Sequence, residues 1–148
     1  MRPYRLTKPM ATWLLKTEPA IYSWEKLAED TKARWDGVRN YPSRNHIRAM
    51  KPGDLVFIFD GGDEQMVSGL GRVASEPYDD PSSDESKWSV VDIEAVLPLT
   101  RPVSWEEIRN TYLLNVMPMI TQTRLTVQPV TDVQRDLILK IAKTELPA

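Results

Sequence analysis

Short apolar runs bounded by polar or turn-forming residues recur along the chain and predict β-strands. The runs are ATWLLKT (11–17), LVFIF (55–59), MVSGLGRVAS (66–75), KWSVVDIEAVLPL (87–99) and RLTV (124–127). Because proline cannot donate to a strand ladder, Pro98 and Pro102 predict the end of the fourth run, and Pro129 predicts the end of the fifth. Within the third run, Gly69 and Gly71 indicate a bulge or a close approach of another segment.

Two helices are predicted in the first half of the chain. Ser23 is placed to cap a helix that carries Trp24 and Leu27 on one face. Pro42 suits the first turn of a second helix over about 41–50, which would present Ile47 to the core.

Two capping boxes predict further helices in the second half of the chain. Ser104 with Glu107 opens a short one, and Thr131 with Gln134 opens the last. The expected apolar stripe of the last helix is Val133, Leu137, Ile138 and Ile141.

The order of these elements, with the strands in the middle, predicts the α+β class with a mainly antiparallel, curved sheet or small barrel. A chain of 148 residues with no linker predicts one domain, over 11–148. Residues 1–10, with two prolines and no periodicity, are interpreted as an N-terminal extension.

The mild net charge of −2 conceals an uneven distribution of charge. Residues 1–59 carry 11 Lys and Arg against 6 Asp and Glu, whereas residues 60–110 carry 4 against 12. A local basic surface can attract phosphates even on an acidic protein, because fields decay within about 8–10 Å in physiological salt. The alternative, that these charges form solvated faces, stays open at this point.

Several classes of protein are excluded or disfavoured by what the sequence lacks. There is no cysteine, so disulfides and thiol chemistry are excluded. No run approaches the ~20 apolar residues of a membrane helix, and the basic start lacks the apolar core of a secretory signal. We therefore expect no membrane partner and an intracellular, cytoplasmic location.

Enzymatic signatures are missing as well. The only histidine, His46, lies inside a predicted helix, where a structural role is the more common one. No nucleophile elbow, zinc-binding helix or phosphate-binding loop motif occurs. We expect no catalytic residue, no metal site and no cofactor.

The stretch WDGVRNYPSRNHIRAM (35–50) has the composition of a ligand site. Trp13, Trp88 and Trp105 are expected in the core and Trp24 is undecided, whereas Trp35 precedes a turn and is predicted to be a stacking surface. Asp36 and Asn40 could read the edge of an unstacked base. Arginines could hold phosphate, and Gly37 would let a ligand approach the backbone.

Six segments together resemble the EVE domain, a family within the PUA-like superfamily. They are WLLKTEP (13–19), WDGVRNY (35–41), RNHIRAMKPGD (44–54), YDDP (78–81), KWSVVDIEAV (87–96) and RLTVQPVT (124–131). The resemblance spans about residues 11–142 and implies a PUA-like curved, mainly antiparallel β-barrel with surrounding helices. It also implies a pocket for a flipped, modified base from DNA or RNA.

The resemblance implies specific site residues, which the segments 16–19, 35–41 and 126–129 would largely supply. The expected nucleobase-binding residues are Lys16, Glu18, Ser23, Trp35, Asp36, Gly37, Val38, Asn40, Tyr41, Asn45, Gln128 and Pro129. The expected phosphate-binding residues are Arg39, Arg44, Arg48 and Arg124.

The leading hypothesis is therefore a non-enzymatic module that binds nucleic acid by reading a modified base. The alternatives are a general RNA-binding PUA-like module, a protein-interaction domain, and an enzyme acting on a modified base. In the last case Asp36 and Lys16 would supply acid and base. Two departures from the family pattern bear on the preferred base: Pro42 removes a side-chain amide, and Asp60 adds a negative charge.

Overall fold

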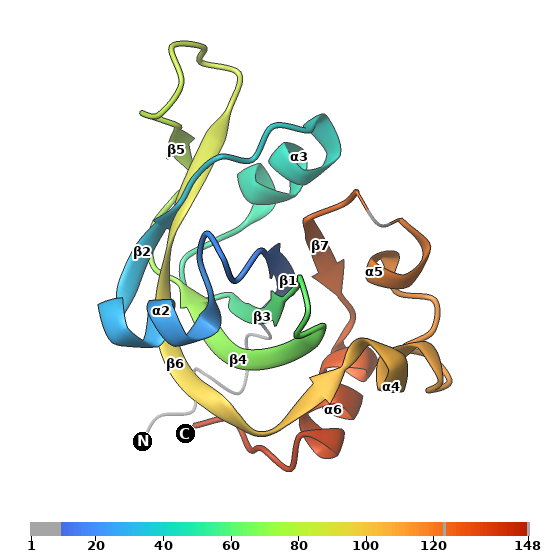
Figure 1. The fold of residues 1–148 in the computed structure, drawn as a ribbon. Coiled ribbons are helices and arrows are strands. Elements are labelled where there is room, and N and C mark those ends of the chain that lie inside the picture. The colour runs from blue at the N-terminus through green and yellow to red at the C-terminus, as the bar shows by residue number, and fades with distance from the viewer. Residues whose placement is uncertain (1–9, 123, 148) are drawn as a thin grey trace.

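The computed structural model describes residues 10–122 and 124–147 (Figure 1). Apart from Met10, the expected N-terminal extension lies outside these residues. The strands are β1 (Thr12–Thr17), β2 (Lys32–Trp35), β3 (Leu55–Asp60), β4 (Met66–Val73), β5 (Tyr78–Asp79), β6 (Ser89–Ser104) and β7 (Val127–Val130). The helices are α2 (Trp24–Asp30), α3 (Tyr41–Ala49), α4 (Trp105–Arg109), α5 (Pro118–Thr121) and α6 (Asp132–Ile141). Of these, β2, β5 and α5 were not predicted.

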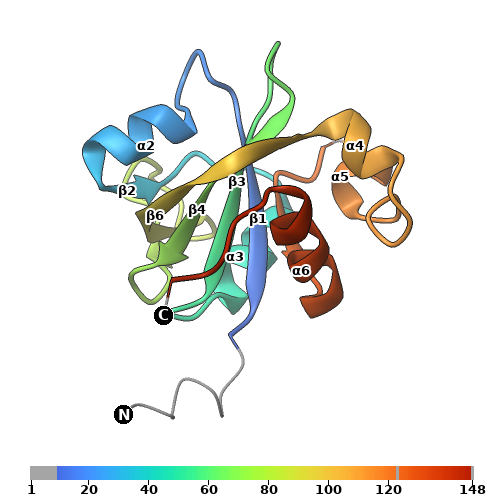
Figure 2. The ribbon, with the colours of Figure 1, turned by 90° about the horizontal axis from the view of Figure 1, so that it is seen from below.

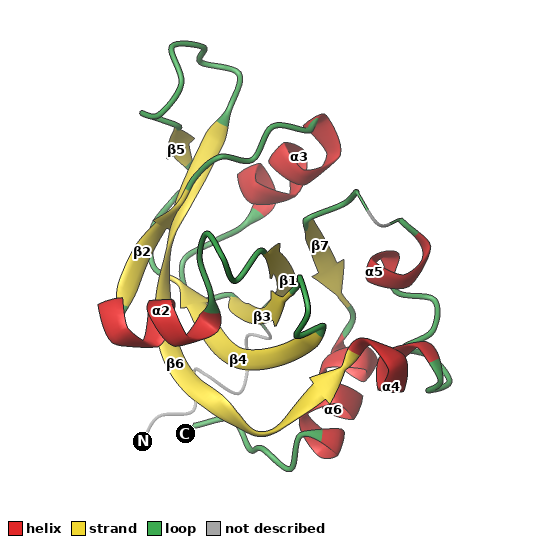
Figure 3. Ribbon diagram, viewed as in Figure 1, coloured by secondary structure: helices red, strands yellow, loops and turns green. Residues whose placement is uncertain are grey.

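One seven-stranded, strongly curved sheet forms the centre of the molecule (Figure 3). Its strands follow the order β2-β6-β4-β3-β1-β7, and β5 pairs with β6. Every pairing is antiparallel except that of β1 with β3. The α+β class is thus confirmed. The barrel is not confirmed, because the path is open and no pairing within the described residues joins β2 to β7.

Helices cover both faces of this sheet (Figure 2). Since side chains alternate along a strand, Leu14 and Phe57 pack towards α4, α5 and α6, whereas Leu15 and Val56 pack towards α2 and α3. All four helices expected from the sequence form, and Ser23, Ser104 and Thr131 cap α2, α4 and α6 as predicted. The stripe expected on α6 is wrong at Val133, which is exposed.

Gly69 is required by the packing of α2 on the sheet. A Cβ atom there would lie 2.0 Å from the ring of Trp24, and the register of β4 against β6 shifts between Val67 and Gly69. The close approach and the bulge expected at this glycine are therefore both present. Trp24, left undecided by the sequence, is a buried core residue.

The predicted ends of two strands were wrong, and both corrections concern proline. Strand β6 continues through Pro98 and Pro102 to Ser104, because its pairing with β2 stops at Glu94, opposite the first residue of β2, and leaves the rest of that side of β6 without a ladder. Strand β7 contains Pro129, which is tolerated because β7 pairs only with β1 at the edge of the sheet.

Candidate functional site

A cavity of about 940 Å³ opens where β1 and β2 end. Nine of the residues singled out in the sequence line it: Lys16, Glu18, Trp35, Asp36, Gly37, Val38, Arg39, Asn40 and Arg124. The remaining lining residues are Thr17, Ile21, Tyr22, Ala33, Arg34 and Thr126. Thr126 reaches the site because its carbonyl accepts the backbone N–H of Lys16 at 2.9 Å.

The buried side chain of Asp80 holds one wall of this cavity in place. Its Oδ2 accepts from the backbone N–H of Gly37 at 3.1 Å and from Nη1 of Arg39 at 2.9 Å, while its Oδ1 accepts from both N–H and Oγ–H of Ser82. Burial opposes the ionisation of this carboxyl, but the hydrogen bonds from Ser82 and Arg39 outweigh it and hold the pKa of Asp80 well below its usual range. The loop after β5 therefore fixes the turn that follows β2.

Gly37 adopts φ +80°, a left-handed conformation that other residues disfavour, and no heavy atom lies within 4 Å of where its Cβ would be. The glycine is thus needed for the turn itself. Gly37 lines the cavity with open space at its Cβ position, and the approach of a ligand to its backbone stays a prediction.

Two aromatic rings form the inner wall. Tyr22 and Trp35 meet edge to face, with ring centroids 5.9 Å apart. The hydroxyl of Tyr22 donates to Asp30 at 2.8 Å, and burial together with this bond raises the pKa of Tyr22 to about 12. Trp35 is only 8% exposed and belongs to the core cluster under α2 and α3, so it lines the cavity and supports the fold at once.

The polar lining contains both signs of charge. Arg34 donates to the carboxylate of Asp36 at 3.3 Å, across the exposed rim of the cavity. Arg39 is paired with Asp80, whereas the guanidinium of Arg124 has no partner among the described residues. Carboxylates are hydrogen-bond acceptors and guanidinium groups are donors, so the lining offers both kinds of group to a ligand.

Asn40 has a structural task that sequence reasoning missed. It caps α3, with its Oδ1 accepting from the backbone N–H of Ser43 at 2.8 Å. Its Nδ2 lies 3.5 Å from the backbone carbonyl of Arg124, a weak contact. The amide group therefore keeps donor capacity towards the cavity.

Arg44 and Arg48, expected to bind phosphate, lie outside the cavity lining. Both donate to the backbone carbonyl of Lys87 at 3.1 Å, and Arg48 also donates to Ser89. No acidic side chain within the described residues pairs with either arginine, so two positioned cations remain uncompensated.

The structure does not bring five of the expected base-binding residues to the cavity. Ser23 caps α2, Asn45 accepts from Arg44, and Tyr41 stacks on Trp88 with centroids 5.2 Å apart. Pro129 lies on the edge strand. Gln128 is fully buried, and its amide accepts from Met119 N–H and donates to the Leu125 carbonyl, which ties α5 to β7.

Sequence reasoning also missed residues that do line the cavity or support it. Ala33 and Arg34 were overlooked because β2 was not recognised, and Ile21 and Tyr22 because they lie in the loop between β1 and α2, where no pattern marked them. The alternating pattern of KARW (32–35) was the only available signal, and four residues are too few for a reliable period. Sequence reasoning assigned no role to Asp80, because its partners Gly37 and Arg39 lie 43 and 41 positions away in the chain.

No group of three or more potential ligand side chains in the described part of the chain is placed to hold a metal ion. His46 packs its ring against Trp13 rather than lining the cavity, and burial lowers its pKa. No helix in residues 10–122 or 124–147 is long and apolar enough to cross a membrane.

Known proteins resemble this chain over most of its length. The sequence profile of the EVE domain matches residues 11–141. Thymocyte nuclear protein 1 from Mus musculus is 35% identical, over 90% of this chain and 74% of its own length. Protein Atu2648 from Agrobacterium tumefaciens superimposes with a TM-score of 0.87 at 35% identity, covering 93% of this chain and 96% of that one. The structure of human THYN1 in complex with DNA containing 5-methylcytosine superimposes with a TM-score of 0.83 at 30% sequence identity. The match covers 92% of this chain and 99% of that one.

Proposed function

Since the chain belongs to the EVE domain family, we propose that it is a non-enzymatic nucleic-acid-binding module that reads a flipped, modified base. The observation that carries the proposal is the cavity of about 940 Å³ with aromatic, acidic and basic groups in its lining. A base buried in a duplex cannot reach such a cavity, so it must be single-stranded or extruded from the stack.

The lining suits the edge of a cytosine. The exposed carboxylate of Asp36 can accept from an exocyclic amine, which is how Asp and Glu recognise cytosine. The apolar surfaces of Trp35 and Val38 can cover a methyl group, and burying one methyl contributes about 0.8 kcal/mol, or roughly fourfold in affinity. The human relative in complex with 5-methylcytosine DNA makes this base the first to test.

The phosphates would lie outside the base cavity. Arg124 at its rim, and Arg44 and Arg48 near the Lys87 carbonyl, are cations without acidic partners in the described chain. Arg39 is less suited than its sequence position suggested, because Asp80 already neutralises it. Arg44, Arg48 and Arg124 can position the backbone of a nucleic acid without reading its sequence.

The test is an affinity measurement with labelled oligonucleotides, single-stranded and duplex, that carry one cytosine or one 5-methylcytosine. We expect the methylated ligand to bind a few-fold more tightly. Asp36→Asn should reduce binding of both cytosine ligands by about five- to 150-fold, since one good base-edge contact is worth about 1–3 kcal/mol.

Asp136→Asn is a matched control, because Asp136 is also an exposed acid next to an arginine, at 3.0 Å from Arg135, but lies on α6. It should leave affinity unchanged. Equal binding of every oligonucleotide, RNA included, with no effect of Asp36→Asn, would contradict base reading and favour a general RNA-binding module.

A cytoplasmic location, expected from the sequence, stays a prediction.

A further inference from the structure

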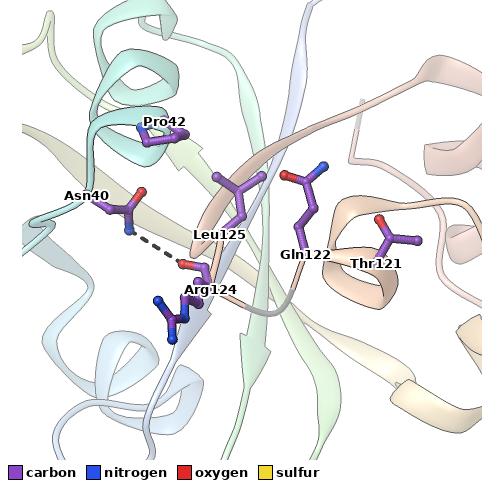
Figure 4. A pocket seen from close by; sticks show the side chains of 6 residues that line it. All are labelled: Asn40, Pro42, Thr121, Gln122, Arg124 and Leu125. Carbon is purple, nitrogen blue, oxygen red and sulfur yellow. Dashed lines mark hydrogen bonds between the residues drawn. The ribbon is translucent and has the colours of Figure 1, made fainter.

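A second cavity, of about 400 Å³, adjoins the base cavity (Figure 4). Asn40 and Pro42 line it from the start of α3, and Thr121 and Gln122 line it from the end of α5. Asn40 and Arg124 line both cavities, so these two residues form the wall between them. None of the residues that face only the second cavity was singled out as a binding residue.

The wall between the cavities carries a cation. Asn40 Nδ2 contacts the backbone carbonyl of Arg124 at 3.5 Å, and both residues line the two cavities (Figure 4). Arg124 is exposed, and its guanidinium group has no partner among the described residues. A cation with free donors at such a boundary suits one phosphate group.

The second cavity offers an apolar floor and polar edges. Leu125 lies between the two sides, at 8% exposure, and the ring of Pro42 flanks it (Figure 4). The amide of Gln122 and the hydroxyl of Thr121 supply donors and acceptors at the opposite side. A flat, partly apolar group with hydrogen-bonding edges fits this combination, as a nucleobase does.

We infer that the second cavity holds the nucleotide next to the flipped base, with the phosphate that joins the two nucleotides at Arg124. The inference rests on the proposed function and extends it, since it makes a dinucleotide the unit of recognition. Two adjacent sites that share a cationic wall match two nucleotides that share a phosphate. The module would then select the sequence context of the modified base as well as the base.

The experiment compares short ligands by NMR titration, which detects weak binding. The ligands are 5-methyl-2′-deoxycytidine with a 5′- or a 3′-phosphate, and dinucleotides that extend each of them by one nucleotide. We expect one of the two dinucleotides to bind at least about fivefold more tightly than the matching monophosphate, the lower end of what one ordered base contributes.

Variants assign that gain to the second cavity. Gln122→Ala and Pro42→Ala should remove the dinucleotide gain and leave monophosphate binding unchanged, whereas Arg124→Ala should weaken both that dinucleotide and its matching monophosphate. Asn115→Ala is the matched control, because Asn115 is an exposed amide beyond α4 that lines neither cavity.

The outcomes separate this inference from the proposed function. Monophosphate binding without any dinucleotide gain, or a gain that survives both second-cavity variants, would overturn the inference alone. If no modified nucleotide binds at all, both the inference and the proposed function are wrong.

Discussion

Asn40 shows how a single side chain serves both the fold and the cavity. Its Oδ1 caps α3 through Ser43, while its Nδ2 points into the wall shared by the two cavities. Substitution by alanine removes both functions together. A variant that restores only the cap is therefore needed to separate them.

We expect Asn40→Ala to lower the free energy of unfolding by about 1 kcal/mol, because an N-cap hydrogen bond is lost. Asn40→Ser should stay close to the parent in stability, since serine also caps helices, but should lose discrimination between bases. Chemical denaturation and oligonucleotide affinity measure the two effects. A serine variant that discriminates as well as the parent would show that the amide does not read the base.

Trp35 was predicted to be a stacking surface, which stays a prediction, and the structure places it both in the cavity lining and in the core. We expect Trp35→Ala to cost about 3–5 kcal/mol of stability, in line with other large aromatic truncations, so its loss of binding would be hard to interpret. Trp35→Phe keeps a ring and most of the volume. It should fold and yet bind the base less tightly, as measured by calorimetric unfolding and titration on the same samples. Unchanged affinity in a folded Trp35→Phe variant would weaken the stacking role.

At the scale of elements, the turn after β2 depends on the loop after β5. Asp80 joins them through Gly37 and Arg39, and both residues lie in the wall of the larger cavity. Thus a change in a loop that does not line the cavity should alter it. The loop is rich in acidic residues, so the sequence does not distinguish the buried carboxylate of Asp80 from its neighbours.

The pH dependence of stability follows from Asp80. Its folded-state pKa lies below its unfolded value of about 3.9, so its contribution is complete above about pH 4 and is lost as the pH falls towards the folded pKa. Asp80→Asn should destabilise the protein by about 1–3 kcal/mol at pH 7, because buried donors lose their acceptor. Unfolding curves between pH 3 and 7 should also show less acid sensitivity in this variant than in the parent. Parallel pH profiles for the two proteins would contradict a role for this carboxylate.

At the scale of the whole molecule, charge of opposite sign is separated along the chain. Residues 1–59 are basic and include Arg44 and Arg48, whereas residues 60–110 are acidic. The net charge of −2 should keep non-specific binding weak. We therefore expect binding only where local arginines such as Arg44 and Arg48 contact the phosphate backbone of a nucleic acid.

The salt dependence of binding tests this arrangement. If Arg44, Arg48 and Arg124 each contact one phosphate, the slope of log K against log salt should be about −2 to −3. Arg48→Ala should reduce the slope by roughly one unit and weaken all oligonucleotides alike. Arg109→Ala, an exposed arginine on α4, is the control. Binding that does not depend on salt would rule out phosphate contacts as its source.

Local patterns in the sequence determined most of the elements and some of the site. The helices were recognisable because caps such as Ser23 and Thr131 act within three residues, and the main strands because their apolar runs are short and bounded. The resemblance to the EVE domain brought together segments 16–18 and 35–40, which do line one cavity. The caps and the apolar runs depend on neighbouring residues, which a sequence shows directly, whereas the association of the two segments came from the resemblance alone.

Only the tertiary structure decided which side chains face the cavity and which hold the fold. Gln128 is turned into the core by a bond to Met119, and Arg39 is neutralised by Asp80, 41 positions away. Strand β6 continues through Pro98 because its pairing with β2 stops at Glu94, which no local pattern shows. Pairing between distant segments sets these outcomes, because a polar group that leaves water must find its partner wherever the fold places one.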